Sequence, residues 1–450
     1  MVQHSGVLSR RDVLRLGSAA AAAGLLSACA LDTTGAPGSQ DSDGLVFYST
    51  QLATTEEAES LRRQILAGFG TPVDYVTDSS STKMFDRLRA DAKAGTSGVQ
   101  VVGALQGEIA TLWAEGLLRD MTDVVEELAT GAGGRRFTRQ YLDLARMDGR
   151  YAFVPWIQAS YLMAARTEAL QYLPPGADVQ RLTYDQLLGW TRTLQQATGS
   201  PELGLPAGPD GLLKRFLQGY AYPSFTGGVN STFRSPDAAA MWQWLRAAWA
   251  TANPQSVTYG NMAEPLLSGE VSVVWDHAVR LVDALQARPD DIVSFPAPVG
   301  PRGRGYLPVL GGLSVPRSVA DPTASIELIR HLTDPARAST TLRTVAWFPP
   351  QDLAGLLGGL PPGIEAEAAT LQAMITAPDA LASSLAVGLG NQSGAYDKVF
   401  TDTFRQIVLG DGDIPSILAT QGAALQGVLD QAGARCWRPD PVGEGVCRVG

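Results

Sequence analysis

The chain has 450 residues, of which 45% are hydrophobic and 18% are charged. This composition is ordinary for a globular protein, and the length is sufficient for two domains with hydrophobic cores. The 45 acidic residues outnumber the 35 lysines and arginines, and the formal net charge is −10. An acidic surface of this kind argues against nucleic acid or an anionic lipid surface as a partner.

The first 28 residues have the features of an export signal. Arg10 and Arg11 precede an apolar, alanine-rich stretch at 16–28, which is too short for a permanent membrane span. A charged start, a short apolar stretch and small residues before a cleavage point are typical of secretory signals, and paired arginines are typical of the Tat type. We therefore predict that residues 1–28 are a Tat-type signal peptide and exclude them from the fold.

Residues 26–29, Leu-Ser-Ala-Cys, resemble a bacterial lipobox, in which the cysteine becomes the lipidated first residue of the mature protein. We expect lipidation at Cys29, and the alternative is an ordinary signal peptide with a coincidental cysteine. Residues 29–43 are mostly small or polar and cannot bury enough apolar surface to fold. They are predicted to form a flexible tether.

The other two cysteines, Cys436 and Cys447, lie close together near the C-terminus. An exported compartment permits disulfides, so we expect these thiols to form a structural bridge. Outside the signal the only histidines are His277 and His331, which lie far in sequence from each other and from the two cysteines, and these four residues do not make a zinc site. The sequence has no phosphate-loop, zinc-protease or nucleophile-elbow motif, which lowers the odds of an enzyme without excluding one. We predict no metal and no cofactor.

After the tether, predicted strands alternate with predicted helices. The strands are 45–48, 73–76 and 99–105, and the helices are 56–69, 83–94 and 109–115. This order predicts an α/β region with parallel strands. In such regions ligands bind beyond the carboxyl ends of the strands. The loops 49–55 and 106–108 follow two of these ends and are predicted to face a ligand.

A second region begins with extended segments and continues with long helical stretches. The predicted strands are 151–156, 160–165, 271–275, 292–296 and 312–315, and the predicted helices are 184–198, 211–219 and 236–250. The chain from residue 323 onwards is predicted to be mostly helical. Trp242, Trp244 and Trp249 fall within one of these helices, where core packing is the favoured interpretation.

Six segments carry a resemblance to a known family, in their order and spacing. They are Glu115–Met121 (EGLLRDM), Tyr151–Trp156 (YAFVPW), Leu267–Val273 (LSGEVSV), Gly311–Pro316 (GGLSVP), Glu327–Pro335 (ELIRHLTDP) and Trp347–Pro350 (WFPP). Together they resemble the family 1 extracellular solute-binding proteins, which include the maltose-binding protein. The chain departs from the family at Gly98–Gln100, where Pro-Asp is usual, and at 106–108, where a different acidic pattern is usual. These departures leave the particular ligand open.

The resemblance implies an α/β, two-lobed periplasmic-binding-protein fold of type II, whose discontinuous lobes are joined by a three-segment hinge and close on a ligand. The matched segments put the crossings near Gln158, Pro308 and Pro349. Lobe 1 is then 44–157 plus 309–348, and lobe 2 is 158–308 plus 349–450.

The implied site lies in the cleft between the lobes. Sugar recognition needs aromatic surfaces for ring faces and polar side chains for hydroxyls. For each tryptophan, and for His277, a purely structural role is about equally favoured. The candidate ligand-binding residues are Gln51, Gln106, Glu108, Trp156, Gln158, Trp275, Asp276, His277, Gly312, Trp347 and Asn391.

The expected function is capture of an extracellular mono- or oligosaccharide and its delivery to the permease subunits of an ABC importer, without catalysis. The protein is expected to be exported and lipid-anchored at the outer face of the cytoplasmic membrane, touching the membrane only through its anchor and binding no nucleic acid. One alternative is a secreted hydrolase with Glu108 and Asp276 as paired carboxylates. Another is a lipid-anchored sensor or accessory protein that keeps the same fold.

Overall fold

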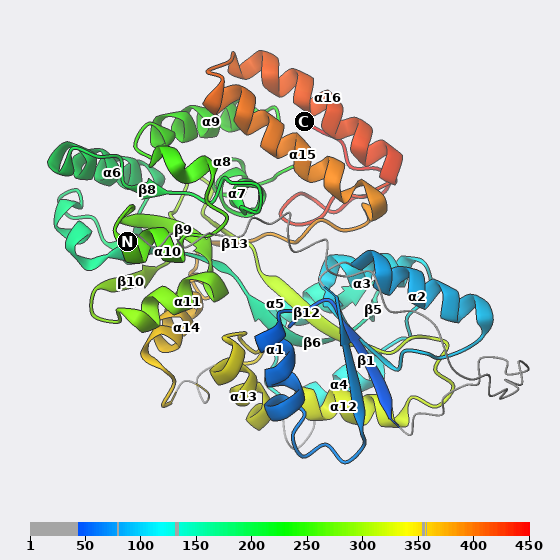
Figure 1. Ribbon diagram of the computed structural model, residues 1–450. Coiled ribbons are helices and arrows are strands. Elements are labelled where there is room, and N and C mark those ends of the chain that lie inside the picture. The colour runs from blue at the N-terminus through cyan, green and yellow to red at the C-terminus, as the bar shows by residue number, and fades with distance from the viewer. Residues whose placement is uncertain (1–43, 79–80, 131–134, 353–355, 357) are drawn as a thin grey trace, which may run out of the picture. The chain divides into compact units, whose positions relative to one another are not determined.

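The computed structural model describes residues 44–78, 81–130, 135–352, 356 and 358–450 (Figure 1). The predicted signal peptide, the lipidation site Cys29 and the tether lie outside the described residues. Among the residues that are described, no helix combines the length and the apolar character needed to cross a membrane.

The first sheet has five strands in the order β2-β1-β3-β12-β6. β1 pairs in parallel with β2 and β3, while β12 pairs antiparallel with β3 and β6. The predicted parallel strands are therefore confirmed, and a strand from much later in the sequence completes the sheet. Its strands are β1 (Leu45–Ser49), β2 (Val73–Thr77), β3 (Val101–Leu105), β6 (Val154–Ala159) and β12 (Val309–Ser314).

The helices of this part are α1 (Thr55–Ser60) with a π turn (Leu61–Ile65), α2 (Ser81–Ala94), α3 (Gln106–Ala114), α4 (Thr122–Thr130), α5 (Arg139–Ala145), α12 (Thr323–Leu332) and α13 (Pro335–Val345). The predicted helices 56–69, 83–94 and 109–115 are confirmed with shifts at their ends, whereas α4 and α5 were not predicted. A two-stranded ribbon of β4 (Arg146–Met147) and β5 (Arg150–Tyr151) precedes β6.

The second sheet has four strands in the order β10-β7-β9-β8. β7 pairs antiparallel with β9 and β10, and β8 is parallel to β9. A short parallel ribbon joins β11 to β13. These strands are β7 (Tyr161–Arg166), β8 (Leu203–Gly204), β9 (Val273–His277), β10 (Ile292–Phe295), β11 (Arg304–Tyr306) and β13 (Ala380–Ala382).

Helices surround this second sheet, and α15 and α16 pack side by side (Figure 1). The α-helices are α6 (Tyr184–Thr198), α7 (Leu213–Phe216), α8 (Tyr222–Thr226), α9 (Pro236–Trp249), α10 (Ala263–Ser268), α11 (Ala278–Ala287), α14 (Pro362–Ile375), α15 (Ser393–Phe404) and α16 (Ile414–Ala432). Short 3-10 and π turns are η3 (Thr167–Tyr172), η4 (Val179–Arg181), η5 (Leu217–Ala221), η6 (Pro254–Val257), η8 (Gly390–Gln392) and η9 (Arg405–Leu409).

Local sequence explains where several helices begin and end. Thr54 and Glu57 form a capping box at the start of α1, because each side chain accepts a hydrogen bond from the other residue's backbone N–H. Thr183 and Gln186 do the same at α6, which ends at Gly199 in the left-handed conformation with φ 80°.

The prediction of a loop at 106–108 is wrong, because these residues form the first turn of α3. Leu105 is the N-cap residue, and its backbone N–H donates to the Glu108 carboxylate at 2.9 Å. A glutamate three residues into a helix satisfies an N–H group that would otherwise lack a partner, so the helix starts earlier than the apolar spacing suggests.

The chain passes from one sheet to the other between β6 and β7, which are separated only by Ser160. It returns between β11 and β12. A third segment meets β6 where Gln158 and Phe348 exchange backbone hydrogen bonds of 2.7 and 2.9 Å. The exact division into two discontinuous lobes stays a prediction.

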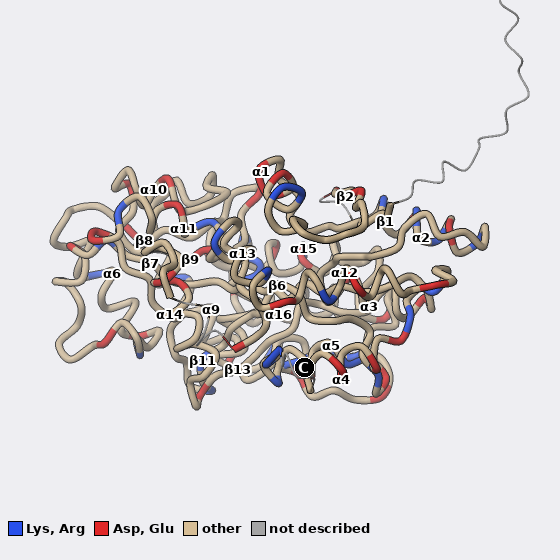
Figure 2. The backbone as a smooth tube through the Cα atoms, turned by 90° about the horizontal axis from the view of Figure 1, so that it is seen from below, with Lys and Arg blue, Asp and Glu red and all other residues tan. Residues whose placement is uncertain are grey.

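The tryptophans of α9 are part of the core, as predicted. Trp242 and Trp244 are 0% and 7% exposed, and each indole N–H has a partner, the Tyr222 hydroxyl and the Tyr184 carbonyl respectively, both at 2.9 Å. Trp249 is half-buried and packs edge-on against Phe404. Figure 2 shows basic and acidic residues interspersed along the described chain, with no continuous basic stripe on any element.

Candidate functional site

A cavity of about 480 Å³ lies beside the carboxyl ends of β3 and β9. Its volume falls in the range of small-molecule sites. Elements that flank both sheets contribute to its wall. The lining residues are Ser81, Phe85, Leu105, Gly107, Glu108, Thr111, Tyr161, Leu212, Arg215, His277, Arg280, Val309, Trp347, Leu385, Ala386, Leu389, Gly390, Ser393, Tyr396 and Asp397.

Glu108 supplies a polar group from the first turn of α3. Its carboxylate accepts from the Thr50 hydroxyl at 2.7 Å as well as from the Leu105 N–H at 2.9 Å. Burial raises the pKa of the Glu108 carboxyl above its ordinary value, and these hydrogen bonds oppose that shift. The side chain is therefore held in a fixed position at the wall of the cavity.

His277 and Trp347 form an aromatic corner of the cavity. Their ring centroids are 6.0 Å apart, and the His277 ring also stands edge-on to Tyr161 at 5.0 Å. The Trp347 indole N–H donates to the Glu57 carboxylate at 3.1 Å, which fixes the plane of the ring. Burial, with a smaller effect of Arg280, lowers the pKa of His277 to about 3. The imidazole is thus neutral at pH 7 and can both donate and accept a hydrogen bond.

Three of the four charged side chains that line the cavity have a partner of opposite charge, and the fourth, Glu108, is held by neutral hydrogen-bond donors. Asp397, on α15, accepts from Arg215 at 3.2 Å and from the Gln218 amide at 3.0 Å, and Lys214 lies 3.4 Å away. Arg280 lies 3.8 Å from the carboxylate of Asp276. The two cationic side chains of the lining, Arg215 and Arg280, are therefore already paired with carboxylates.

Of the predicted ligand-binding residues, Glu108, His277 and Trp347 line the cavity together. Asp276 lies behind His277, is fully buried, and accepts from the backbone N–H groups of Met262 at 2.8 Å and His277 at 2.7 Å. Burial raises the pKa of Asp276 to about 6, an effect that the charge of Arg280 opposes. Asp276 therefore supports the loop before α10 and does not face the cavity.

The predicted tryptophans Trp156 and Trp275 are core residues. Trp275 is 0% exposed and stacks on Tyr161 with ring centroids 4.8 Å apart and planes 4° apart. Trp156 is 3% exposed and packs edge-on against Phe47 at 5.7 Å. Neither lines the cavity, because aromatic neighbours cover both rings.

Three predicted glutamines are buried close to the cavity without lining it. Gln51 donates to the Thr50 hydroxyl at 3.0 Å and so supports the Thr50–Glu108 contact. Gln106 donates to the carbonyl of Leu144 at 3.1 Å. Gln158 lies at the crossing of the chain between the sheets and is 1% exposed.

The last two predicted residues also lie outside the lining. Gly312 is a packing residue in β12, since a Cβ atom there would lie 2.0 Å from the ring of Phe153. Asn391 is exposed, although its neighbours Gly390 and Ser393 line the cavity.

Several lining residues were not predicted from the sequence. Arg280 lies one helical turn after His277, on the helix that starts at the end of β9, and this spacing was a usable signal. Tyr161 reaches the cavity because it pairs with His277 across β7 and β9. Arg215, Tyr396 and Asp397 come from segments with no local signal, and only packing brings them to the site.

Comparison with solved structures finds the same fold in solute-binding proteins. The sugar-binding protein MalE of Xanthomonas citri has a TM-score of 0.69 and 14% identity, covering 86% of this chain and 98% of that one. UgpB of Mycobacterium tuberculosis, in complex with glycerophosphocholine, has a TM-score of 0.68 and 17% identity, again covering 86% and 98%. Maltose-bound MalE3 of T. maritima has a TM-score of 0.66 and 18% identity, covering 86% and 100%.

These similarities show the two-lobed, type II periplasmic-binding-protein fold. A comparison with curated protein sequences finds no match. The family model described as bacterial extracellular solute-binding protein matches residues 53–338. That span is more than half of the chain, and the protein belongs to the bacterial extracellular solute-binding protein family.

Proposed function

We propose that this protein captures an uncharged mono- or oligosaccharide in the cavity and delivers it to the permease subunits of an ABC importer. The observation that carries the proposal is the lining itself, in which an aromatic corner and fixed polar groups surround about 480 Å³ of space. Sugar rings pack their apolar faces on aromatic side chains, and their hydroxyls need hydrogen-bond partners in a closed site.

The paired charges support an uncharged ligand. Arg215 pairs with Asp397 and Arg280 with Asp276, so neither cation of the lining needs an anionic ligand to neutralise it. Charged side chains held in this way still offer N–H and oxygen groups to hydroxyls. Structural neighbours with sugars in their names, from X. citri and T. maritima, support the same class. The structural neighbour in complex with glycerophosphocholine indicates the competing class of ligand, a polyol that carries a phosphate group.

The proposed location is the outer face of the cytoplasmic membrane. The twin arginines at 10–11 and the lipobox ending at Cys29 support export followed by lipidation. Several acyl chains make a firm anchor, because each buried CH₂ contributes about 0.8 kcal/mol. The anchor is then the only contact with the membrane, and the permease is the protein partner.

We propose binding without catalysis. The alternative hydrolase needs two carboxylates on either side of a sugar, and the pair considered from the sequence was Glu108 and Asp276. Asp276 is fully buried and holds two backbone N–H groups, so only Glu108 of this pair faces the cavity. A sensor or accessory protein would bind the same sugar, and it would differ by leaving uptake unchanged when its gene is deleted.

A thermal-shift screen of the purified protein against a panel of carbohydrates tests the proposal. At about 100 times its Kd, a ligand raises the free energy of unfolding by roughly 2.7 kcal/mol, which gives a clear shift. We expect a shift with a neutral sugar and no release of nitrophenol from chromogenic glycosides. A shift with glycerophosphocholine and with no sugar would overturn the proposed ligand class.

A further inference from the structure

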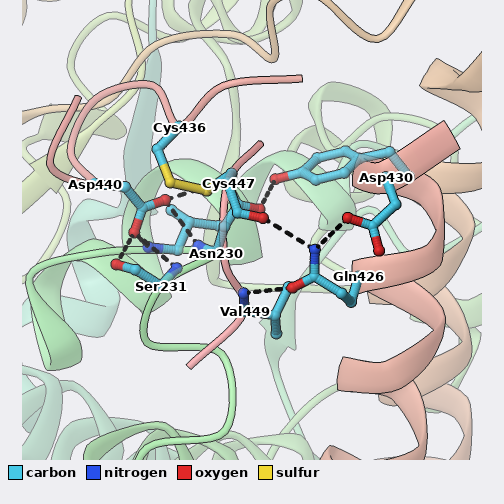
Figure 3. Close-up of a disulfide and its surroundings, with 10 residues drawn as sticks. Asn230, Ser231, Gln426, Asp430, Cys436, Asp440, Cys447 and Val449 are labelled. Carbon is cyan, nitrogen blue, oxygen red and sulfur yellow. Dashed lines mark hydrogen bonds between the residues drawn. A yellow bond between two sulfur atoms is a disulfide. The ribbon is translucent and has the colours of Figure 1, made fainter. Parts of the chain in front are cut away.

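The C-terminal segment forms a closed loop that packs on α16. Cys436 and Cys447 are joined by a disulfide (Figure 3). Gln426 of α16 donates to the Cys447 carbonyl at 3.1 Å and accepts from the Val449 N–H at 2.9 Å. The loop is therefore covalently closed at its ends and attached to a long helix.

Asp440, inside this loop, holds a second segment in place. Its side chain is 2% exposed, and its carboxylate accepts from the backbone N–H groups of Val229 at 3.0 Å, Asn230 at 2.8 Å and Ser231 at 3.0 Å. The Asn230 side-chain amide donates to it as well, at 3.0 Å. Hydrogen bonds to an ionised acceptor are strong, so the loop and segment 229–231 form one unit (Figure 3).

This unit touches the cavity wall at three points. The Tyr396 hydroxyl donates to the Asn230 side-chain carbonyl at 3.0 Å, and the Tyr396 ring lies 5.3 Å from the ring of Trp437. The Ser384 N–H donates to the carbonyl of Arg438 at 2.9 Å. Tyr396 is in the first turn of α15, next to Asp397, and Ser384 immediately precedes the lining residues 385 and 386.

The part of the wall held in this way has little regular structure of its own. Between β13 and η8, residues 383–389 belong to no helix or strand. Gly388 and Gly390 have positive φ values of 73° and 51°, and glycine, which has no Cβ, leaves the backbone more freedom than other residues do. A loop of this kind needs external contacts to keep a single conformation.

We propose that the disulfide-closed loop 436–447 is a positioning element of the binding cavity, and that Asp440 and Tyr396 are its positioning residues. Through Asn230 and Tyr396 it fixes the first turn of α15, which carries Asp397. Through Arg438 it fixes the segment 384–390. The expected effect on ligand affinity rests on the proposed function. The expected effect on the order of the cavity wall does not depend on it.

Amide hydrogen exchange of the full protein without ligand tests the inference. Tyr396→Phe removes the hydroxyl that reaches Asn230, and we expect exchange across 384–397 to become about fivefold faster, the effect of one lost hydrogen bond. Cys436→Ser combined with Cys447→Ser should have a larger effect, about tenfold or more. Amides of β7 and β9 should keep their rates in both variants.

Tyr259→Phe is the matched control. Its hydroxyl donates to Glu270 at 2.5 Å, and neither residue belongs to the cavity lining or to the loop 436–447. Its exchange across 384–397 should equal that of the parent protein. Unchanged exchange in this segment in both the Tyr396→Phe and the double serine variant overturns the inference.

Maltose serves as the binding probe in calorimetry. If the parent protein binds it, Tyr396→Phe should weaken the affinity by about twofold to fivefold while Tyr259→Phe leaves it unchanged. Equal affinities in the parent and Tyr396→Phe proteins, with faster exchange in the variant, would refute the part of the inference that concerns affinity. Failure of the parent protein to bind maltose counts against the proposed ligand alone, and the exchange data then decide the inference.

Discussion

Two of the predicted tryptophans, Trp347 and Trp275, provide a sharp test of the site. Trp347 lines the cavity and its ring lies 6.0 Å from His277, whereas Trp275 is 0% exposed and stacks beneath Tyr161. We therefore expect Trp347→Ala to weaken carbohydrate binding and Trp275→Ala to weaken the fold.

The size of each effect follows from the surroundings of the ring. Replacing a fully buried tryptophan with alanine leaves an enclosed void and lowers the free energy of unfolding by about 3–5 kcal/mol. Trp347 borders an existing cavity, so its removal enlarges that cavity and loses the indole contact with Glu57 at 3.1 Å. An aromatic residue that packs on a ligand contributes more than about 1 kcal/mol, which raises Kd at least about fivefold.

Denaturant unfolding and calorimetry with the sugar that gives the largest thermal shift separate the two effects. Trp244 lies on α9, is buried in the hydrophobic core and does not line the cavity. Trp244→Ala should therefore behave like Trp275→Ala, with a lower denaturant midpoint of unfolding and the parental Kd for the sugar in the folded fraction. The reasoning fails if Trp275→Ala raises Kd while its unfolding midpoint stays at the parental value, or if Trp347→Ala binds normally.

Three further predictions concern other parts of the chain. Glu367 on α14 is 0% exposed and neither carboxylate oxygen has a partner among the described residues, so burial, with a smaller effect of Asp283, raises its pKa well above 4.5. Above pH of about 4.5 the folded state keeps a proton on Glu367 that the unfolded state loses, so the free energy of unfolding falls as the pH rises. Calorimetry should therefore show that Glu367→Met raises Tm more at pH 8 than at pH 5. A Cβ at Gly107 would lie 2.6 Å from the Ala386 carbonyl oxygen, so Gly107→Val should hold the cavity open and weaken sugar binding in calorimetry without a comparable loss of Tm; parental affinity would contradict this. Cys29→Ala should release the protein into the medium, and mass spectrometry of the parent should find an acylated N-terminal cysteine; an unmodified N-terminus would refute lipidation.

Local sequence was sufficient for much of the fold. Alternating apolar stretches and helical spacing predicted β1, β2 and β3 and the helices between them, because a buried strand and an amphipathic helix each leave a periodic pattern. The order of the six family-like segments between residues 115 and 350 indicated the family. The first turn of α3 was missed because a hydrogen bond, and not the apolar pattern, sets its start at Gln106.

The strand ends that border the cavity could be identified from the sequence, but not the individual side chains that line it. Trp275 and His277 point to the same face of β9 because side chains alternate along a strand. Tyr161, from the paired strand β7, stacks on Trp275 and covers it, while His277 remains at the edge of the cavity. How deeply each side chain of β9 is buried therefore decides which of them reaches the cavity.

The opposite wall depended wholly on tertiary structure. Arg215 and Asp397 are 182 positions apart in the sequence and meet at 3.2 Å. The residue pattern of a single helix or strand cannot predict such a pairing, because the pairing results from how the helices pack against one another. The sequence alone determined the family, the class of fold and the strand ends near the site, while packing decided which side chains form the cavity.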